Sequence, residues 1–273
     1  MIIKLKGADF SANNLGQINV RELNDFTKSA ITASSNTAMT EVQKYALDDF
    51  FYNIGAFGSK NNIYAKVKLL ALPIIANGID GAKVNFKNNI SLPLSDNWTL
   101  DDYGIKAISE TPRIAVTLPE SISQDNVTIV SAISYDLLKA AGASQTTNLI
   151  VVGNTNPGRF YASAITNSSG VVSIYAQRDA GTNIISPVTL PNSNAFCVTL
   201  SASESYTISD NGVVDRDAVF SSSNLSSNTI YPFANLTKNS LYPVRFLFVS
   251  EALTKEEALE VKAAYDTLQS YFM

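Results

Sequence analysis

The chain has 273 residues, of which 45% are hydrophobic and 16% are charged, and its net charge is −4. This apolar content is enough to form a core and excludes an intrinsically disordered chain, while the length fits one large β domain or two ordinary domains. Lys and Arg form no basic stripe, so we expect no nucleic-acid partner.

The absence of histidine and the single cysteine narrow the possible chemistry. Without histidine the chain cannot build a Ser-His-Asp or Cys-His nucleophile, and a zinc ion loses its usual ligands. Cys197 lies in the apolar run Ala195–Val198, which predicts an inert, buried thiol. We therefore expect no catalytic residue, no metal and no cofactor.

Most of the polar side chains in the chain are uncharged. The chain has 31 Ser, 20 Thr and 26 Asn residues, a composition common in extracellular β-sandwiches and virion proteins. The N-terminal residues contain no apolar stretch of signal-peptide length. The most hydrophobic stretch, Leu69–Ile79, contains Pro73 and is too short to span a membrane, so we expect no membrane partner.

Residues 1–24 are predicted to form an extended N-terminal arm, and residues 25–60 a helical segment. Within that segment Thr40 and Gln43 have the spacing of a capping box, and apolar residues follow at helical spacing. The next pattern predicts one long strand over Ile63–Ile75.

Strand patterns then recur roughly every 8–15 residues, which favours a two-layer antiparallel sandwich over residues 61–273. Phe160–Thr166 and Val171–Gln177 are predicted to pair as a hairpin. Asn211 and Gly212 have the residue types of a type I′ turn between two further strands.

The chain is predicted to end in a second helix. Thr254 and Glu257 form another capping box, and Val261, Tyr265 and Leu268 lie on one face of the helix that follows. This apolar face is expected to pack on the sandwich or on a neighbouring subunit.

Three parts of the sequence resemble known families. The arm Lys6–Gly16 resembles the opening of many structural proteins from phages of gut Bacteroidetes, including crAss-like phages. Ala65–Ala76 resembles a strand that those proteins carry shortly after a capped helix. The pair Val244–Ser250 and Leu253–Glu257 resembles the last strand and helix of concanavalin A-like, laminin-G-type sandwiches.

The resemblance implies an all-β fold, an antiparallel two-sheet sandwich of the concanavalin A-like jelly-roll type, with an N-terminal arm and helix and a C-terminal helix. It implies a virion protein made in the host bacterial cytoplasm: a head-fibre, capsid-decoration or tail-fibre subunit. Such a subunit would form a homotrimer, and its binding partners would be other virion proteins. Phe10, Asn13 and Asn14 of the arm are then candidates for assembly contacts.

The alternative function is a carbohydrate-binding adhesin that recognises host surface or mucin glycans. Trp98 is the only tryptophan, and with Asp96 and Tyr103 it could place a stacking ring beside hydrogen-bond acceptors, as lectins do. The competing interpretation places Trp98 in the core or in an interface, where a lone tryptophan is usually found.

Two further alternatives follow from the carboxylates. A glycoside hydrolase needs two of them at a defined separation. The Glu-x-Asp-x-x-Glu strand pattern of laminarinase-type hydrolases does not occur, so we predict that the protein is not an enzyme. Asp210–Asp217 lacks the spacing of an EF-hand and is predicted to be a hairpin turn, with a calcium site as the alternative.

Overall fold

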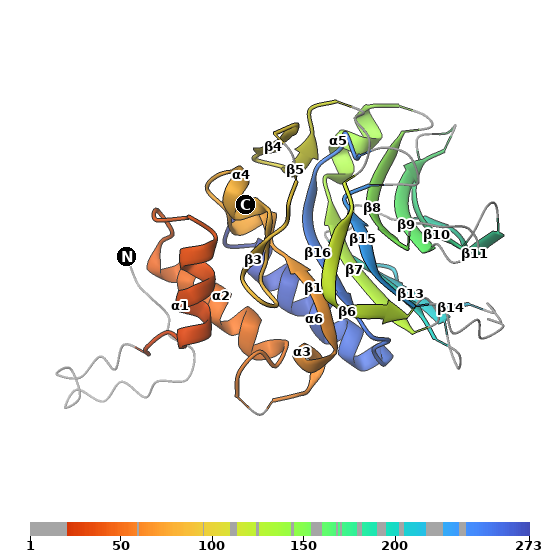
Figure 1. Ribbon diagram of the computed structural model, residues 1–273. Coiled ribbons are helices and arrows are strands. Elements are labelled where there is room, and N and C mark those ends of the chain that lie inside the picture. The colour runs from red at the N-terminus through yellow and green to blue at the C-terminus, as the bar shows by residue number, and fades with distance from the viewer. Residues whose placement is uncertain are drawn as a thin grey trace.

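The computed structural model describes most of residues 21–273. The positions outside the description are 1–20, 59, 95, 110–113, 124–125, 143–144, 154–159, 168, 170, 179–181, 190–194, 202–204, 217–225 and 235–238. In the described part, three layers are stacked (Figure 1). A helical layer covers one face of a large antiparallel sheet, and a second antiparallel sheet covers the other face. The helical layer consists of α1 (Asp25–Ala33), α2 (Glu41–Asn53) and α6 (Lys255–Gln269).

The larger sheet has eight described strands. Its central strands contribute side chains to two hydrophobic cores, one on each face of the sheet. In spatial order the strands are β14 (Gly212–Arg216), β13 (Ser205–Ser209), β12 (Phe196–Leu200), β7 (Val127–Ile133), β16 (Val244–Ser250), β5 (Gly104–Ala107) and β4 (Trp98–Asp101). Strand β1 (Val67–Ala71) also pairs with β16, beyond the short contact between β16 and β5.

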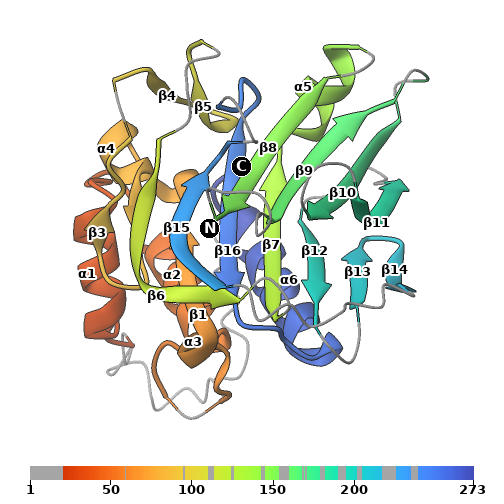
Figure 2. The ribbon, with the colours of Figure 1, turned by 45° about the vertical axis from the view of Figure 1, so that its right-hand side comes forward.

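The second sheet has six described strands and lies across the core from the first (Figure 2). Its order is β11 (Thr182–Thr189), β10 (Val172–Arg178), β9 (Phe160–Thr166), β8 (Thr146–Val152), β15 (Ser226–Pro232) and β6 (Val116–Ser123). All pairings in both sheets are antiparallel. The predicted antiparallel two-sheet sandwich is therefore confirmed.

Short elements connect the layers. They are α3 (Ile63–Lys66), η1 (Pro73–Ile75), α4 (Ile79–Ala82), α5 (Tyr135–Ala140) and the two-stranded ribbon of β2 (Val84–Asn85) and β3 (Ile90–Ser91).

Local signals in the sequence are confirmed where they are strongest. Both capping boxes are formed, at Thr40 with Gln43 and at Thr254 with Glu257, so α2 and α6 begin where predicted. Strands β9 and β10 pair as the predicted hairpin. Strands β13 and β14 also form the predicted hairpin, but its two loop residues are Asp210 and Asn211. Neither has a positive φ, so the predicted type I′ turn is wrong; the positive φ, +101°, falls on Gly212, the first residue of β14.

The predicted long strand over Ile63–Ile75 is wrong in its length. These residues form α3, then β1, and then η1. Asn61 starts the first turn by accepting a hydrogen bond from the Ile63 amide at 3.2 Å. Pro73 opens η1, a position where its missing N–H breaks no backbone hydrogen bond.

Buried Asp48 of α2 connects the end of the arm to the helical layer. Its carboxylate accepts hydrogen bonds from the Asn24 amide at 3.0 Å and the Thr27 hydroxyl at 2.7 Å, and it pairs with Arg21. Asn24 in turn caps α1. Residues 21–24 therefore pack with the helices, although the sequence analysis assigned them to the arm. The arm residues Phe10, Asn13 and Asn14 lie outside the described residues.

Strand β16 is covered on both faces. Phe246 and Phe248 point into the helical layer, whereas Leu247 and Val249 point into the core between the sheets. A strand buried on both faces is apolar at successive positions, which explains its continuous hydrophobic run. The ring of Phe246 stacks on Tyr265 of α6, with centroids 4.2 Å apart and planes at 7°.

Cys197 of β12 is free and buried in the helical core. Burial raises the pKa of its thiol to about 12, so the thiolate form is disfavoured at neutral pH. This confirms the burial of the thiol that the sequence predicted.

The packing of Phe246 yields a stability prediction. Phe246→Ala would remove a ring that contacts both α2 and α6, and we expect it to lower the free energy of unfolding by about 3–5 kcal/mol. Urea denaturation followed by circular dichroism measures the change. Leu259→Ala, at a 42% exposed position of α6, is the control and should change stability by less than about 0.5 kcal/mol. Equal midpoints for the two variants would contradict this account of the layer.

Candidate functional site

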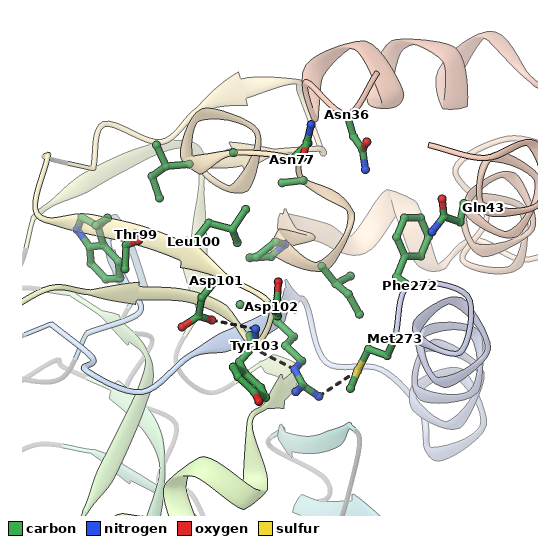
Figure 3. Close-up of a pocket in the computed structure, with 18 residues that line it drawn as sticks. Asn36, Gln43, Asn77, Thr99, Leu100, Asp101, Asp102, Tyr103, Phe272 and Met273 are labelled. Atoms are coloured by element: carbon green, nitrogen blue, oxygen red, sulfur yellow. Dashed lines mark hydrogen bonds between the residues drawn. The ribbon is translucent and has the colours of Figure 1, made fainter. Parts of the chain in front are cut away.

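A cavity lined by described residues lies between the β4–β5 hairpin and the helical layer (Figure 3). Its volume is about 890 Å³, which is within the range typical of small-molecule sites. Figure 3 shows Thr99, Leu100 and Asp101 on one side and Gln43, Phe272 and Met273 opposite, with Asn36 and Asn77 between them.

A tight hairpin forms the first wall. Asp101 of β4 pairs with Gly104 of β5, so Asp102 and Tyr103 form the two-residue loop at the tip. The Asp101 carboxylate accepts a hydrogen bond from the Tyr103 amide at 2.9 Å and fixes the turn. Both tip residues are exposed, and Tyr103 is 45% exposed.

Gly104 lets this hairpin approach β16 closely. Its φ is +124°, and a Cβ atom placed on it would lie 2.4 Å from the Val244 carbonyl oxygen. A side chain at this position would therefore push the hairpin away from the sheet.

A break in the alternation of β16 brings Arg245 to the cavity. Val244 belongs to the core between the sheets and Phe246 to the helical core, although strand alternation would place both on the same face. The pairing with β7 shifts register between these two residues. A bulge of this kind re-aims a side chain, and here the side chain is that of Arg245, which lines the cavity.

Arg245 is 9% exposed and is held by groups from both walls. Its Nε donates to the Tyr103 carbonyl oxygen at 3.1 Å, and its Nη1 donates to the Met273 sulfur at 3.1 Å. The guanidinium carbon lies 5.9 Å from the centre of the Tyr103 ring, within range of a cation–π contact. No carboxylate within the described part of the chain forms an ion pair with Arg245.

The opposite wall is fixed by amides. The Asn36 side chain donates to the Ile75 carbonyl at 2.9 Å, which ties the α1–α2 loop to η1. The Gln43 side chain donates to the Tyr271 carbonyl at 3.0 Å, which ties the start of α2 to the residues after α6. Asn77 lies at the rim and is exposed.

The two aspartates differ in their surroundings. Asp101 forms an ion pair with Lys106 at 2.6 Å, so its charge is balanced within the hairpin. Asp102 is exposed at the tip. The site therefore offers carboxylate acceptors, a guanidinium donor and an accessible aromatic ring, which together can bind a polar ligand with several hydroxyl groups.

The structure separates the three predicted glycan contacts. Tyr103 lines the cavity and is accessible. Trp98 also borders the cavity but is 4% exposed, and its ring packs edge-on against Phe233 at 5.8 Å, so it belongs to the core. The burial of its ring therefore corrects the suggestion that Trp98 is the stacking surface for a sugar. Asp96 is exposed and lies outside the residues that line the cavity.

Arg245 was missed by the sequence analysis. Its signal was a single charge inside the apolar strand Val244–Ser250. A buried charge in such a strand needs a reason, either a partner or a ligand.

The carboxylates of the Asp210–Asp217 segment that the structure describes, and Glu120, are engaged elsewhere. Asp210 pairs with Lys262, and Asp215 pairs with Lys255 at 2.8 Å. Glu120 pairs with Lys68. The described residues contain no group of three or more His, Cys, Asp and Glu side chains that could hold a metal ion. None of the described helices combines the length and hydrophobicity that a membrane span requires.

No family model matches this chain, and no curated protein matches it. Among solved structures, a Trypanosoma rangeli sialidase bound to 2,3-difluoro-KDN is similar, with a TM-score of 0.50, 10% identity, and coverage of 84% of this chain and 40% of the sialidase. An SAP-like heptameric pentraxin from Limulus polyphemus has a TM-score of 0.40 at 13% identity, covering 57% of this chain and 77% of the pentraxin. Bacteriophage CBA120 tailspike protein 2, in its enzymatically active domain, has a TM-score of 0.37 at 11% identity, with coverage of 72% and 35%.

At these identities the likeness concerns the fold alone, and the chain spans 40% of the length of the first sialidase. It nevertheless overturns the prediction that the protein is not an enzyme. That prediction took the missing laminarinase-type pattern as evidence against catalysis. Solved structures with this fold at a TM-score of 0.50 are sialidases, so a sandwich without that pattern gives no ground for setting enzymes aside.

The contact between Gly104 and β16 gives a prediction with a matched control. Gly104→Ala and Gly212→Ala both place a side chain at positive φ, which costs roughly 1–2 kcal/mol. Only the Cβ of the first would also meet a backbone carbonyl, whereas a Cβ at the second would have no described atom within 4 Å apart from its chain neighbours. We expect Gly104→Ala to lose about 1–3 kcal/mol more than Gly212→Ala in urea denaturation. Equal losses would show that the hairpin does not need this close approach.

Proposed function

We propose that this chain is a carbohydrate-binding β-sandwich module of a phage virion appendage, and that the cavity beside the β4–β5 hairpin holds the glycan. The observation that carries this proposal is the combination found at one mouth: the accessible ring of Tyr103, the free carboxylate of Asp102 and the guanidinium of Arg245.

The chemistry of this combination suits a sugar. Sugar rings have an apolar C–H face that stacks on an aromatic ring, and their hydroxyl groups donate to carboxylates and accept from cations. A cavity of about 890 Å³ has room for a short oligosaccharide. The fixed walls reduce the ordering that binding requires, because Asn36 and Gln43 are already held by backbone carbonyls.

The virion setting is supported by other features. The arm Lys6–Gly16 resembles the opening of phage structural proteins, and the surface chemistry of Ser, Thr and Asn is common among virion proteins. In such an appendage the arm serves assembly and the sandwich carries the glycan site. Head fibres, capsid decorations and tail fibres are the candidate positions.

Tyr103→Ala tests the glycan site. Immobilised glycans, including neutral, carboxylated and sulfated ones, are screened with the full chain, and affinities are then measured by calorimetry. Loss of the stacking ring is expected to weaken binding about tenfold, equivalent to about 1.4 kcal/mol. Tyr52→Ala is the matched control, since Tyr52 is 41% exposed but lies away from this cavity, and its affinity should be unchanged.

Two outcomes would count against the proposal. If no glycan is retained by the wild-type chain, the cavity is not a sugar site. If Tyr52→Ala and Tyr103→Ala weaken binding equally, the sugar binds elsewhere. Release of reducing sugar from a retained glycan, measured in parallel, distinguishes a binding module from a glycosidase.

Assembly is tested by light scattering. We expect the full chain to have a mass of three times 29.4 kDa, as a homotrimer. A variant lacking residues 1–20 keeps Arg21 and Asn24, which hold the helical layer, and should fall to one chain mass if the arm directs assembly. Unchanged circular dichroism confirms folding. A full chain that is monomeric contradicts the self-assembling appendage.

A further inference from the structure

We infer that the glycan bound in this cavity carries a carboxylate, and that Arg245 binds it. This inference rests on the proposed function and specifies its ligand class as an acidic saccharide. It follows from the hydrogen bonds that Arg245 leaves unmade and from the balance of charge around the cavity.

The donors of Arg245 are only partly used. A guanidinium has five N–H groups, and Arg245 employs one on Nε and one on Nη1. The remaining three have no acceptor among the described residues, and Nη2, which makes no hydrogen bond, is accessible to solvent although the residue as a whole is 9% exposed. These N–H groups are therefore open to the cavity, which Arg245 lines, and are available to a ligand. A ligand oxygen in the cavity would supply the acceptor.

The geometry favours a planar, bidentate partner. The Tyr103 carbonyl holds Nε and the Met273 sulfur holds Nη1, so two walls fix the orientation of the guanidinium plane before any ligand arrives. A carboxylate matches two adjacent N–H groups of such a fork, and charge-assisted pairs of this kind are about twice as strong as neutral hydrogen bonds. The bulge in β16 that turns Arg245 toward the cavity then serves ligand recognition.

The surrounding charges favour a single negative charge. Arg245 is the only cation among the described residues that line the cavity, and Asp101 and Asp102 line it as well. Asp101 is balanced by Lys106, which leaves one guanidinium and one side-chain carboxylate, that of Asp102, at the mouth of the cavity. A dianionic phosphate would have one cation to pair with and would be repelled by Asp102. A carboxylate paired with Arg245 leaves Asp102 to accept sugar hydroxyls.

The test begins with the ligand, so that it does not depend on a variant that folds. Each carboxylated glycan retained by the wild-type chain is compared with its counterpart in which the carboxyl is reduced to a primary alcohol. We expect the reduced sugar to bind at least tenfold more weakly. Equal affinity for the two forms, or retention of neutral or sulfated glycans in preference to carboxylated ones, overturns the inference but leaves the glycan site standing. Retention of no glycan removes the proposed function itself.

Variants then assign the effect to Arg245. Arg245→Gln should lower the affinity for the carboxylated sugar at least tenfold and leave the affinity for the reduced sugar nearly unchanged. The effects of the protein variant and of the ligand reduction are then not additive. Arg245→Lys keeps the charge without the fork and should recover only part of the affinity. Lys44→Gln removes one positive charge from the residue next to Gln43 in sequence, which does not itself line the cavity, and should have no effect. An equal loss in Lys44→Gln and Arg245→Gln would show long-range attraction and overturn the role of Arg245.

Discussion

The burial of β16 on both faces is the constraint on which the rest of this structure depends. One strand supplies Phe246 and Phe248 to the helical core and Leu247 and Val249 to the core between the sheets. It also pairs with β7, β1 and β5 along its edges. Neither the helical layer nor the second sheet could bury its apolar face without this strand and its neighbours, because each layer has one apolar side and needs a partner for it.

The same strand departs from regular alternation at one point, and the cavity lies there. If Arg245 followed the pleat, it would occupy the side opposite to Val244 and Phe246, and these two residues would share a face. Because of the bulge, Val244 and Phe246 pack in different cores, and the side chain of Arg245 lies in neither core. A charged residue next to two apolar cores is costly unless it meets polar groups. The Tyr103 carbonyl provides one such group, and the cavity provides the space for another.

The sequence predicted those features that depend on neighbours along the chain. Thr40 with Gln43 and Thr254 with Glu257 cap helices through contacts three residues apart. Asn211 and Gly212 mark the hairpin between β13 and β14, although not the type of its turn. The error over Ile63–Ile75 has a related cause, since apolar alternation alone cannot distinguish one strand from a helical turn followed by a short strand. Arg245 depends on the pairing of β16 with β7, which are more than a hundred residues apart, and no local pattern carries that information.

Trp98 shows why residue type alone does not define a sugar site. Its neighbours Asp96 and Tyr103 suggested a platform, yet β4 turns the indole toward Phe233 in the core and leaves the smaller ring of Tyr103 accessible at the hairpin tip. The tip keeps its place because Gly104 allows close contact with β16. Whether the ring of Trp98 or of Tyr103 is accessible to a ligand therefore depends on how the hairpin packs on the sheet. This packing is a tertiary feature that the sequence of the hairpin alone does not specify.

The cavity walls come from segments that are far apart in the chain and that meet only when the helical layer is docked. Asn36 ties the α1–α2 loop to η1, Gln43 ties α2 to the residues after α6, and Arg245 ties β16 to the hairpin. A ligand that touches more than one wall binds the docked arrangement and not the undocked one. By mass action such a ligand stabilises the docked layer, so affinity at the cavity and attachment of the helices to the sheet are thermodynamically linked. The helical layer is thus part of the binding site as well as a cover for the sheet.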